Sequence, residues 1–313
     1  MIAATAIALT GSMAPAAHAA PSTSELTKKI ELASNQLEDV AESFNKLKID
    51  LQKTAAEQAA LEASLAPAKA ALAAATAEVG TLASTSYKQG RIGPMSALLG
   101  AGEESSLIDR MSYLDLITRA NQRDINSFTA TTQGYDQRQA ALKATRAKQV
   151  AQSKALVARK TTIEKNLKSL RAMRTAAYGS ATESASSGAA GTAPSVSGSA
   201  GEAVAYAYAA ANKPAYYGYG DEGPDTYDCS GLTKMAWNAA GKSLPHNAAA
   251  QYSATARITR SQLKPGDLVF YRSLGHVALY VGSGMIIDAS REGEPVKKRT
   301  IDIMTPYGFG RVA

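Results

Sequence analysis

Cysteine and aromatic residues are scarce in this sequence of 313 residues. It has a single cysteine, Cys229, and aromatic side chains make up only 6% of the chain. One cysteine cannot form a disulfide within the chain, so Cys229 is a buried structural thiol, an intermolecular partner or a nucleophile. Ten of the fourteen tyrosines and the only tryptophan, Trp237, follow residue 200. This distribution predicts that the compact core lies in the C-terminal third of the chain.

Long uncharged hydrophobic runs are also lacking after the N-terminal segment. The first 19 residues combine an apolar stretch with the small-residue pattern Ala17-His18-Ala19, which is typical of a signal peptide cleaved after Ala19. No later stretch approaches the roughly 18 apolar residues that a membrane-spanning helix needs. We therefore expect a secreted, extracytoplasmic protein whose mature chain has no transmembrane segment.

The N-terminal half carries the heptad pattern of long helices. From Leu26 to Leu82, mainly apolar or small residues recur in alternating steps of four and three. This spacing predicts a coiled coil, which Pro67 is expected to bend locally. Four glycines and Pro94 then interrupt the pattern, and a second arm follows with one apolar and one mostly polar row. We expect residues 22–178 to form an α-helical coiled-coil hairpin with a regulatory role.

The two arms of this hairpin differ in charge. Residues 21–90 contain seven basic and nine acidic residues, whereas residues 119–178 contain thirteen basic and three acidic ones. Opposite charge balance favours pairing between the arms. The basic arm is either a solvated helix face that pairs with the first arm, or a contact surface for anionic wall polymers or lipid headgroups. No motif indicates nucleic-acid binding.

The remaining sequence predicts a linker and a compact domain. Residues 179–200 are rich in Gly, Ser, Ala and Thr, which is typical of a flexible linker with a reach of about 25 Å. Residues 201–313 predict two helices followed by short strands in GDLVFY, HVALYVG and MIIDAS. Because the helices precede the strands, we expect an α+β fold with segregated layers.

The surroundings of Cys229 favour the nucleophile. Cys229 begins a predicted helix that Asp228 would cap, and a helix N-terminus stabilises a thiolate and lowers its pKa. His276 opens a predicted strand and is the candidate base, while His246 lies in a loop and is expected to be structural or to contact the substrate. Pairing of the last two strands would bring Asp288 to His276, where it could orient the imidazole.

No metal or cofactor is expected from the sequence. Only three histidines are present, and the first lies in the predicted signal peptide. One cysteine and two histidines do not form a recognisable zinc ligand cluster.

Five stretches of the C-terminal region resemble the NlpC-type cysteine peptidases, a papain-like group that cuts the stem peptides of bacterial peptidoglycan. They follow the order found in that family: YGYGDEGPDTYDCSGL, LPHNAAAQ, LKPGDLVFY, HVALYVGSG and MIIDAS. The resemblance covers about 110 residues. It implies a papain-like NlpC-type catalytic domain, with helices and an antiparallel sheet, over residues 201–313.

The same resemblance implies roles for individual residues. Cys229 falls on the nucleophile and His276 on the general base. The third catalytic position, often a second histidine in the family, falls here on Asp288. The other implied residues bind the oxyanion or the substrate: Tyr217, Asp228 and Ser230.

The interruption between the arms, SALLGAGEESSLIDRMSYLDLI, resembles the hairpin tip of bacterial cell-separation hydrolases. In that group the coiled coil is thought to hold the enzyme inactive and to be engaged by a membrane partner of the FtsEX transporter type. The resemblance therefore implies autoinhibition, with release in cell separation or wall remodelling during cell division.

Three functions remain open from the sequence. The first is a peptidoglycan D,L-endopeptidase that cuts the D-glutamyl to diaminopimelate bond through an acyl-enzyme. The second is an amidase of the related Cys,His-dependent type, which cuts between the sugar and the first alanine. The third is a non-enzymatic wall-binding scaffold, which only the coiled coil supports.

Overall fold

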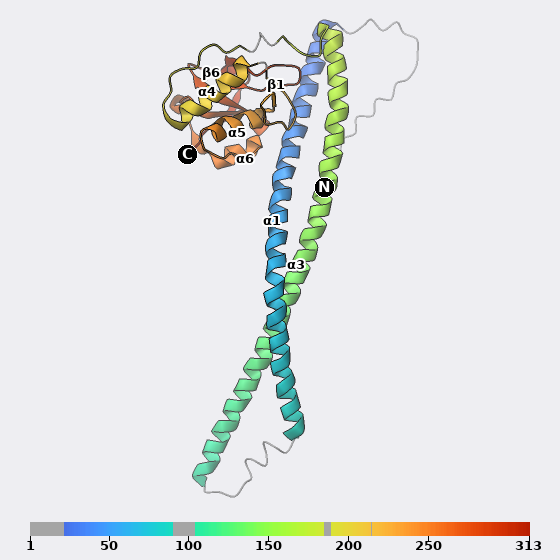
Figure 1. Ribbon diagram of the computed structural model, residues 1–313, viewed down its shortest axis with the longest axis vertical. Coiled ribbons are helices and arrows are strands. Elements are labelled where there is room, and N and C mark those ends of the chain that lie inside the picture. Colours follow the sequence, from blue (N-terminus) through green and yellow to red (C-terminus); the bar gives the residue numbers. More distant parts are fainter. Residues whose placement is uncertain (1–21, 90–103, 185–188, 214) are drawn as a thin grey trace, which may run out of the picture. The chain divides into compact units, whose positions relative to one another are not determined.

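The computed structural model of this protein describes residues 22–89, 104–184, 189–213 and 215–313 (Figure 1). The predicted signal peptide and residues 90–103 of the predicted hairpin tip lie outside these ranges, so both remain predictions. The chain divides into two compact units. One unit joins the residues up to Glu42 with Thr162–Ala313, and the other is Ser43–Thr161.

Two long helices run through both units in the described part of the chain. Helix α1 spans Thr23–Gln89 and helix α3 spans Glu104–Tyr178. Every position of the heptad seam predicted in α1 is buried or half-buried, which agrees with the pattern of fours and threes. Pro67 lies inside α1 and does not end it. None of the described helices is both long and apolar enough to cross a membrane.

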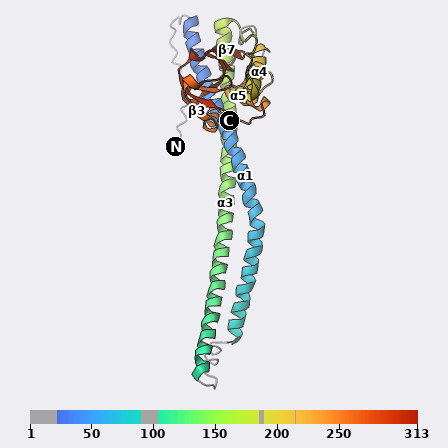
Figure 2. The ribbon, with the colours of Figure 1, turned by 90° about the vertical axis from the view of Figure 1, so that its left-hand side faces the viewer.

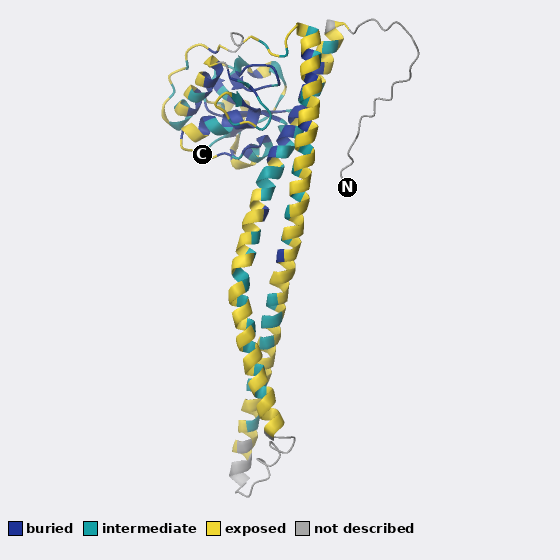
Figure 3. Ribbon diagram, turned by 45° about the vertical axis from the view of Figure 1, so that its right-hand side comes forward, coloured by how far each residue is buried: buried dark blue, intermediate teal, exposed yellow. Residues whose placement is uncertain are grey.

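In its described residues, the unit Ser43–Thr161 consists of the C-terminal part of α1 and the N-terminal part of α3. Residues of the predicted polar row of α3, among them Gln139, Arg146 and Lys160, are exposed. Arg146 reaches Glu62 of α1 with an ion pair of 2.8 Å, as opposite charge on the two arms predicts. Figure 3 shows that exposed and half-buried residues dominate these helices, while buried residues gather in the C-terminal domain.

The C-terminal domain begins with helices and ends with strands, as the sequence predicts. Its helices are α4 (Gly198–Asn212), α5 (Cys229–Ala239) and α6 (Ala248–Ala254). A short parallel pair, β1 (Tyr216–Tyr217) and β2 (Thr226–Tyr227), lies between α4 and α5 in the sequence. Three single turns of 3₁₀ helix connect later elements: η2 (Arg260–Gln262), η3 (Arg272–Leu274) and η4 (Ile301–Ile303).

The main sheet of the described chain has six antiparallel strands in the order β3-β8-β4-β5-β6-β7. The strands are β3 (Ala256–Ile258), β4 (Leu268–Tyr271), β5 (His276–Gly282), β6 (Met285–Asp288), β7 (Lys297–Thr300) and β8 (Pro306–Arg311). Figure 2 labels the two edge strands, β3 and β7. The fold is therefore α+β with segregated layers, preceded by long helices.

Alternation along β4 divides the core between the two faces of the sheet. Leu268 and Phe270 belong to the larger cluster, which includes Leu232 of α5. Val269 and Tyr271 point to the opposite face and belong to a smaller cluster. Because successive side chains of a strand alternate between faces, one apolar strand supports both layers. Burying both faces of β4 fixes the neighbouring strand β5, which carries His276 at its start.

The segment predicted as a flexible linker is bound to the domain where the structure describes it. Ala190 is 3% exposed and belongs to the main core cluster. The side chain of Asn212 accepts hydrogen bonds from the amides of Ala190 and Gly191, at 2.9 and 3.2 Å. Helix α4 also begins at Gly198 rather than at residue 201. The domain boundaries drawn from the sequence stay predictions.

Candidate active site

Asp228 caps the helix that presents the only thiol of the chain. Cys229 is the first residue of α5, and the carboxylate of Asp228 accepts a hydrogen bond of 2.6 Å from the amide of Gly231. The second carboxylate oxygen accepts from the amide of Gly220 at 3.0 Å. The predicted N-cap is thus confirmed, and Cys229 lies fully buried at the positive end of the helix dipole.

Gly231 allows the loop before α5 to approach the helix closely. A methyl group at this position would lie 2.2 Å from the carbonyl oxygen of Asp221. That same oxygen accepts the amide of Asp228 at 3.0 Å. Because Gly231 has no side chain, the loop can approach α5 closely enough for the carbonyl of Asp221 to hold the capping residue Asp228.

Replacing this glycine should disturb the domain. We expect Gly231→Ala to lower the free energy of unfolding by about 1–3 kcal/mol, because the methyl group overpacks a contact with backbone. Denaturant unfolding measures the change. Gly80→Ala is the matched control, since a methyl group there meets nothing within 4 Å. Equal stability of Gly231→Ala and the parent protein would contradict the close approach.

His276 and Asp288 form a buried pair across the hairpin of β5 and β6. His276 Nε2 lies 2.9 Å from Asp288 Oδ2, and both side chains are at most 1% exposed. Arg299 of β7 forms an ion pair of 2.8 Å with the other oxygen of Asp288. Burial alone would raise the pKa of Asp288, but Arg299 and His276 outweigh it and hold that pKa below its ordinary value. The predicted proximity of Asp288 to His276 is confirmed.

Tyr217 and Ser230 lie beside the thiol. The hydroxyl of Tyr217 is buried and has no hydrogen-bond partner within the described ranges. Burial, followed by the charges of Glu38 and other nearby groups including Cys229, raises its pKa well above the ordinary value. The hydroxyl of Ser230 lies 3.2 Å from Asp228 Oδ1. The structure therefore brings the predicted substrate-side residues to the same place as Cys229.

The N-terminal part of α1 enters this site with a segment that the sequence did not single out. We name residues 35–42 the acidic segment, because it contains Glu38, Asp39 and Glu42. It belongs to the same compact unit as the C-terminal domain. Glu38 and Glu42 are 3% and 6% exposed, which is unusual for carboxylates.

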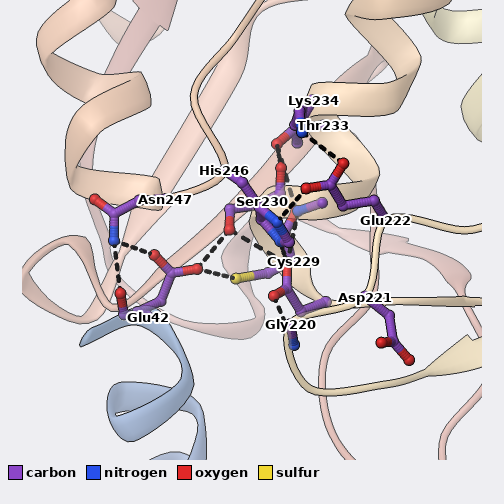
Figure 4. Close-up of polar contacts among 12 residues, drawn as sticks. Glu42, Gly220, Asp221, Glu222, Cys229, Ser230, Thr233, Lys234, His246 and Asn247 are labelled. Carbon is purple, nitrogen blue, oxygen red and sulfur yellow. Dashed lines mark hydrogen bonds and ion pairs between the residues drawn. The ribbon is translucent and has the colours of Figure 1, made fainter. Parts of the chain in front are cut away.

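Glu42 lies in a cradle of hydrogen-bond donors next to the thiol (Figure 4). Its carboxylate accepts from Ser230 Oγ at 2.6 Å, from Asn247 Nδ2 at 2.7 Å and from the amide of Ala248 at 2.6 Å. Cys229 Sγ donates to the same carboxylate at 3.5 Å. Burial and the nearby charge of Asp228 raise the pKa of Glu42 to about 7.

Glu38 occupies the other side of the site. Its carboxylate accepts a hydrogen bond of 2.5 Å from His276 Nδ1 and also pairs with Arg272. Arg272 Nη2 donates to the carbonyl of Asn35 at 2.6 Å and pairs with Asp39. The guanidinium of Arg272 therefore ties the acidic segment to the turn that precedes β5.

The acidic segment contributes to pKa shifts of both His276 and Cys229. Burial disfavours the imidazolium of His276, but Glu38 and Asp288 outweigh burial and raise its pKa to about 9. Burial, with the charges of Glu42 and Glu38, raises the pKa of the Cys229 thiol well above its usual range. The sequence predicted a lowered thiol pKa. That prediction is wrong for this arrangement, because burial, together with the charges of Glu42 and Glu38, outweighs the helix dipole.

His246 lies away from the pair of Cys229 and His276. Its two ring nitrogens contact Glu222 at 2.7 Å and Asp228 at 2.8 Å. Burial would lower the pKa of His246, but the bond to Asp228 and the charges of Asp228 and Glu222 raise it. His246 thus braces the capping residue of α5, which agrees with the structural interpretation.

Sequence reasoning missed the residues that close the site: Glu38, Glu42, Asn247 and Arg272. Two acidic residues four positions apart on a helix are ordinarily a solvated face, so the pattern gave no reason to single them out. Asn247 lay within the stretch LPHNAAAQ, which was noticed only as a family motif. Among the described residues, a candidate metal-binding group joins Glu38 with Cys229 and His276.

Solved structures with similar domains include peptidoglycan hydrolases. The NlpC/p60 domain of the peptidoglycan hydrolase SagA is 32% identical and aligns with 36% of this chain and 98% of that one, with a TM-score of 0.33. The peptidoglycan hydrolase RipB from Mycobacterium tuberculosis is 26% identical over 36% of this chain and 64% of that one, with a TM-score of 0.33.

Curated relatives match the C-terminal region. A probable endopeptidase p60 from Listeria monocytogenes is 46% identical over 101 residues, which are 31% of this chain and 21% of the relative. A probable endopeptidase from Corynebacterium glutamicum is 39% identical over 89 residues, 28% of this chain and 42% of the relative. The chain thus spans less than half the length of these relatives. Residues 214–307 match the NlpC/P60 family, and this C-terminal domain belongs to it.

Proposed function

We propose that this protein is a secreted cysteine peptidase that cuts the stem peptides of peptidoglycan in the bacterial cell wall. One observation carries the proposal: the thiol of Cys229, at a helix N-terminus, lies within 4.8 Å of a ring nitrogen of His276, whose Nε2 is held by the buried carboxylate of Asp288. This is the arrangement of nucleophile, base and orienting group that acyl transfer requires. The names of the relatives, endopeptidase and peptidoglycan hydrolase, support the same substrate class.

In the proposed mechanism, the Cys229 thiolate attacks the carbonyl carbon of the scissile amide. The imidazolium of His276 donates a proton to the leaving amine, and a thioester joins the acyl group to Cys229. His276 then removes a proton from water, which hydrolyses the thioester and frees the acid. The hydroxyl of Tyr217, which has no hydrogen-bond partner among the residues that the structure describes, is suited to donate to the oxyanion. Asp288 positions the imidazole and stabilises its charge.

The bond that we propose is the one between D-glutamate and diaminopimelate. Mass spectrometry of the fragments released from purified sacculi tests this choice. An endopeptidase of this type leaves an alanyl-glutamyl dipeptide on the sugar, whereas an amidase releases the whole stem peptide without its sugar. A wall-binding scaffold would bind the sacculi and release nothing. Either of the last two results would contradict the proposal.

We further propose that the acidic segment holds the enzyme inactive. The carboxylate of Glu38 hydrogen-bonds His276 Nδ1, the nitrogen that would exchange a proton with Cys229. The carboxylate of Glu42 occupies the cradle of hydrogen-bond donors that includes Ser230. The two carboxylates therefore block the substrate, and together with burial they raise the pKa of the thiol. Both carboxylates are buried and accept several hydrogen bonds. This supports an inhibitory contact rather than an incidental one.

The partner proposed to release this contact is a membrane protein of the FtsEX transporter type. The start of α3 carries large apolar side chains that are well exposed: Ile108 at 70%, Tyr113 at 66% and Leu116 at 64%. Exposed apolar residues grouped in this way are typical of a protein interaction site. The proposal places the enzyme outside the cytoplasm, in cell separation or wall remodelling.

Substitutions of His276 and Asp288 should differ in severity. We expect His276→Ala to lose about 100-fold more activity than Asp288→Asn, which is the ratio that base and orienting residue show in a comparable triad. The amide of asparagine can still hold the ring, but it cannot stabilise the imidazolium. Values of kcat/KM across pH measure both effects. If Asp288→Asn matched the parent enzyme in rate and pH profile, another residue would hold the imidazole.

A further inference from the structure

Three side chains of different chemistry meet in the closed site. A carboxylate oxygen of Glu38, the sulfur of Cys229 and a ring nitrogen of His276 all lie within 4.8 Å of one another. They come from α1, α5 and β5, and each is at most 3% exposed. Oxygen, sulfur and nitrogen ligands at about 2.0–2.3 Å from Zn²⁺ are roughly 3.3–3.7 Å apart in a tetrahedral site. The ion would therefore separate Glu38 from His276 Nδ1, which lie 2.5 Å apart, and draw the thiolate toward both.

The surroundings of His276 have the form found around zinc ligands. Asp288 holds Nε2 at 2.9 Å, which leaves Nδ1 directed at Glu38. Histidines that bind zinc ordinarily donate the other ring N–H to a carboxylate in this way. Arg299 in turn pairs with Asp288 at 2.8 Å and fixes its orientation. The supporting contacts that a zinc-bound histidine requires are therefore already present.

A fourth ligand is also within reach. Glu42 Oε1 lies 3.5 Å from Cys229 Sγ, close to the distance between neighbouring ligands of one metal ion. Water could take that position instead. Carboxylates of Glu38, Glu42 and Asp228 surround the thiol in a buried space, and a divalent cation would offset their mutual repulsion.

We infer that the closed protein binds one Zn²⁺ ion through Glu38, Cys229 and His276, and that this ion locks the acidic segment onto the active site. On binding, the Cys229 thiol and His276 Nδ1 each release a proton to solvent, and no electron is transferred. Zinc is here an inhibitor that stabilises the closed state. The inference rests on the proposed inhibitory contact, but metal binding can be measured without any hydrolysis.

Sequence reasoning excluded zinc because one cysteine and two histidines make no ligand cluster. The missing ligand is Glu38, which is separated from His276 by 238 positions. Only the folded arrangement of α1 against the domain brings this oxygen to the other two ligands. The pair of Cys229 and His276 alone would offer two ligands, so the site exists only in the closed state.

The test uses the full chain, freed of metal with a chelator. Zn²⁺ is titrated in competition with a chromophoric chelator, and Co²⁺ serves as a spectroscopic probe of thiolate coordination. We expect one ion per chain, a thiolate-to-cobalt absorption band, and slower peptidoglycan hydrolysis when zinc is added. Loss of a residue that hydrogen-bonds a metal ligand costs about 10–100-fold in metal affinity. Glu38 is a direct ligand in this site, so Glu38→Gln should weaken zinc binding by about 100-fold or more.

Controls separate the site from general effects. Glu31→Gln removes an exposed carboxylate from the same helix and should leave zinc affinity unchanged. Cys229→Ala should abolish the cobalt band, and circular dichroism checks that each variant is folded. Equal zinc affinity of Glu38→Gln and the parent protein, or no binding of either metal, would overturn the inference. Zinc binding without any hydrolase activity would overturn the proposed function instead and leave the metal site standing.

Discussion

Cys229→Ala should abolish the release of fragments from peptidoglycan while leaving the fold intact. Loss of the nucleophile in a comparable triad costs about 10⁶-fold in kcat, because the acyl-enzyme forms on that side chain. The change removes one sulfur atom from the start of α5. Asp228 still caps that helix through the amide of Gly231, so the domain should unfold at nearly the same temperature. Mass spectrometry of released fragments and thermal unfolding measure the two results.

The Cys229→Ala experiment needs a parent enzyme with a high rate of hydrolysis and a matched control variant. The Cys229→Ala change is therefore made both in the parent chain and in an open variant that lacks the carboxylates of the acidic segment. Ser253→Ala removes one heavy atom from the exposed side of α6 and should leave the rate unchanged. Unchanged turnover after loss of the thiol would remove Cys229 from the mechanism altogether.

Glu38→Gln combined with Glu42→Gln should activate the full chain. Breaking a buried ion pair costs about 3–5 kcal/mol, because the remaining partner keeps an uncompensated charge. Here Glu38→Gln would break the ion pairs with His276 and Arg272, and Glu42→Gln would remove the negative charge from the donor cradle. A shift of even 1.4 kcal/mol changes the ratio of open to closed molecules tenfold. We therefore expect hydrolysis of sacculi to rise about tenfold or more.

The control for activation makes the same change of two charges at exposed positions of α1. Glu31→Gln combined with Glu57→Gln neutralises two exposed carboxylates of α1 and should leave the rate unchanged. A fragment of residues 179–313 retains α4 and the contacts of Ala190, and it should be as active as the double variant. Equal activity per molecule of the parent chain, the double variant and the fragment would leave the long helices as a localisation arm.

Local pattern was enough to predict most of the fold. Heptad spacing predicted the helical arms, and Asp228 before Cys229 predicted the start of α5, because capping and periodicity act over a few residues. The turn between β5 and β6 likewise made the approach of Asp288 to His276 predictable. In the cap of α5 and in the pair of His276 and Asp288, the interacting residues lie at most 12 positions apart.

The closure of the site was not predictable for the opposite reason. Glu42 meets Cys229 across 187 positions, and a carboxylate on a charged helix has the same local pattern whether it faces water or a thiol. The pKa of Cys229 shows the consequence. The helix dipole is a local property and was predicted, whereas two of the carboxylates that act against it together with burial, Glu42 and Glu38, come from a distant helix.

The spacing of Glu38 and Glu42 sets how the enzyme would respond to its activator. Four residues are close to one helical turn, so both carboxylates project from the same face of one rigid helix. Neither can leave while the other stays, because turning or lifting the helix moves both together. Opening is therefore expected to be all-or-none, and a population of these molecules would contain fully silent and fully active enzymes with few in between.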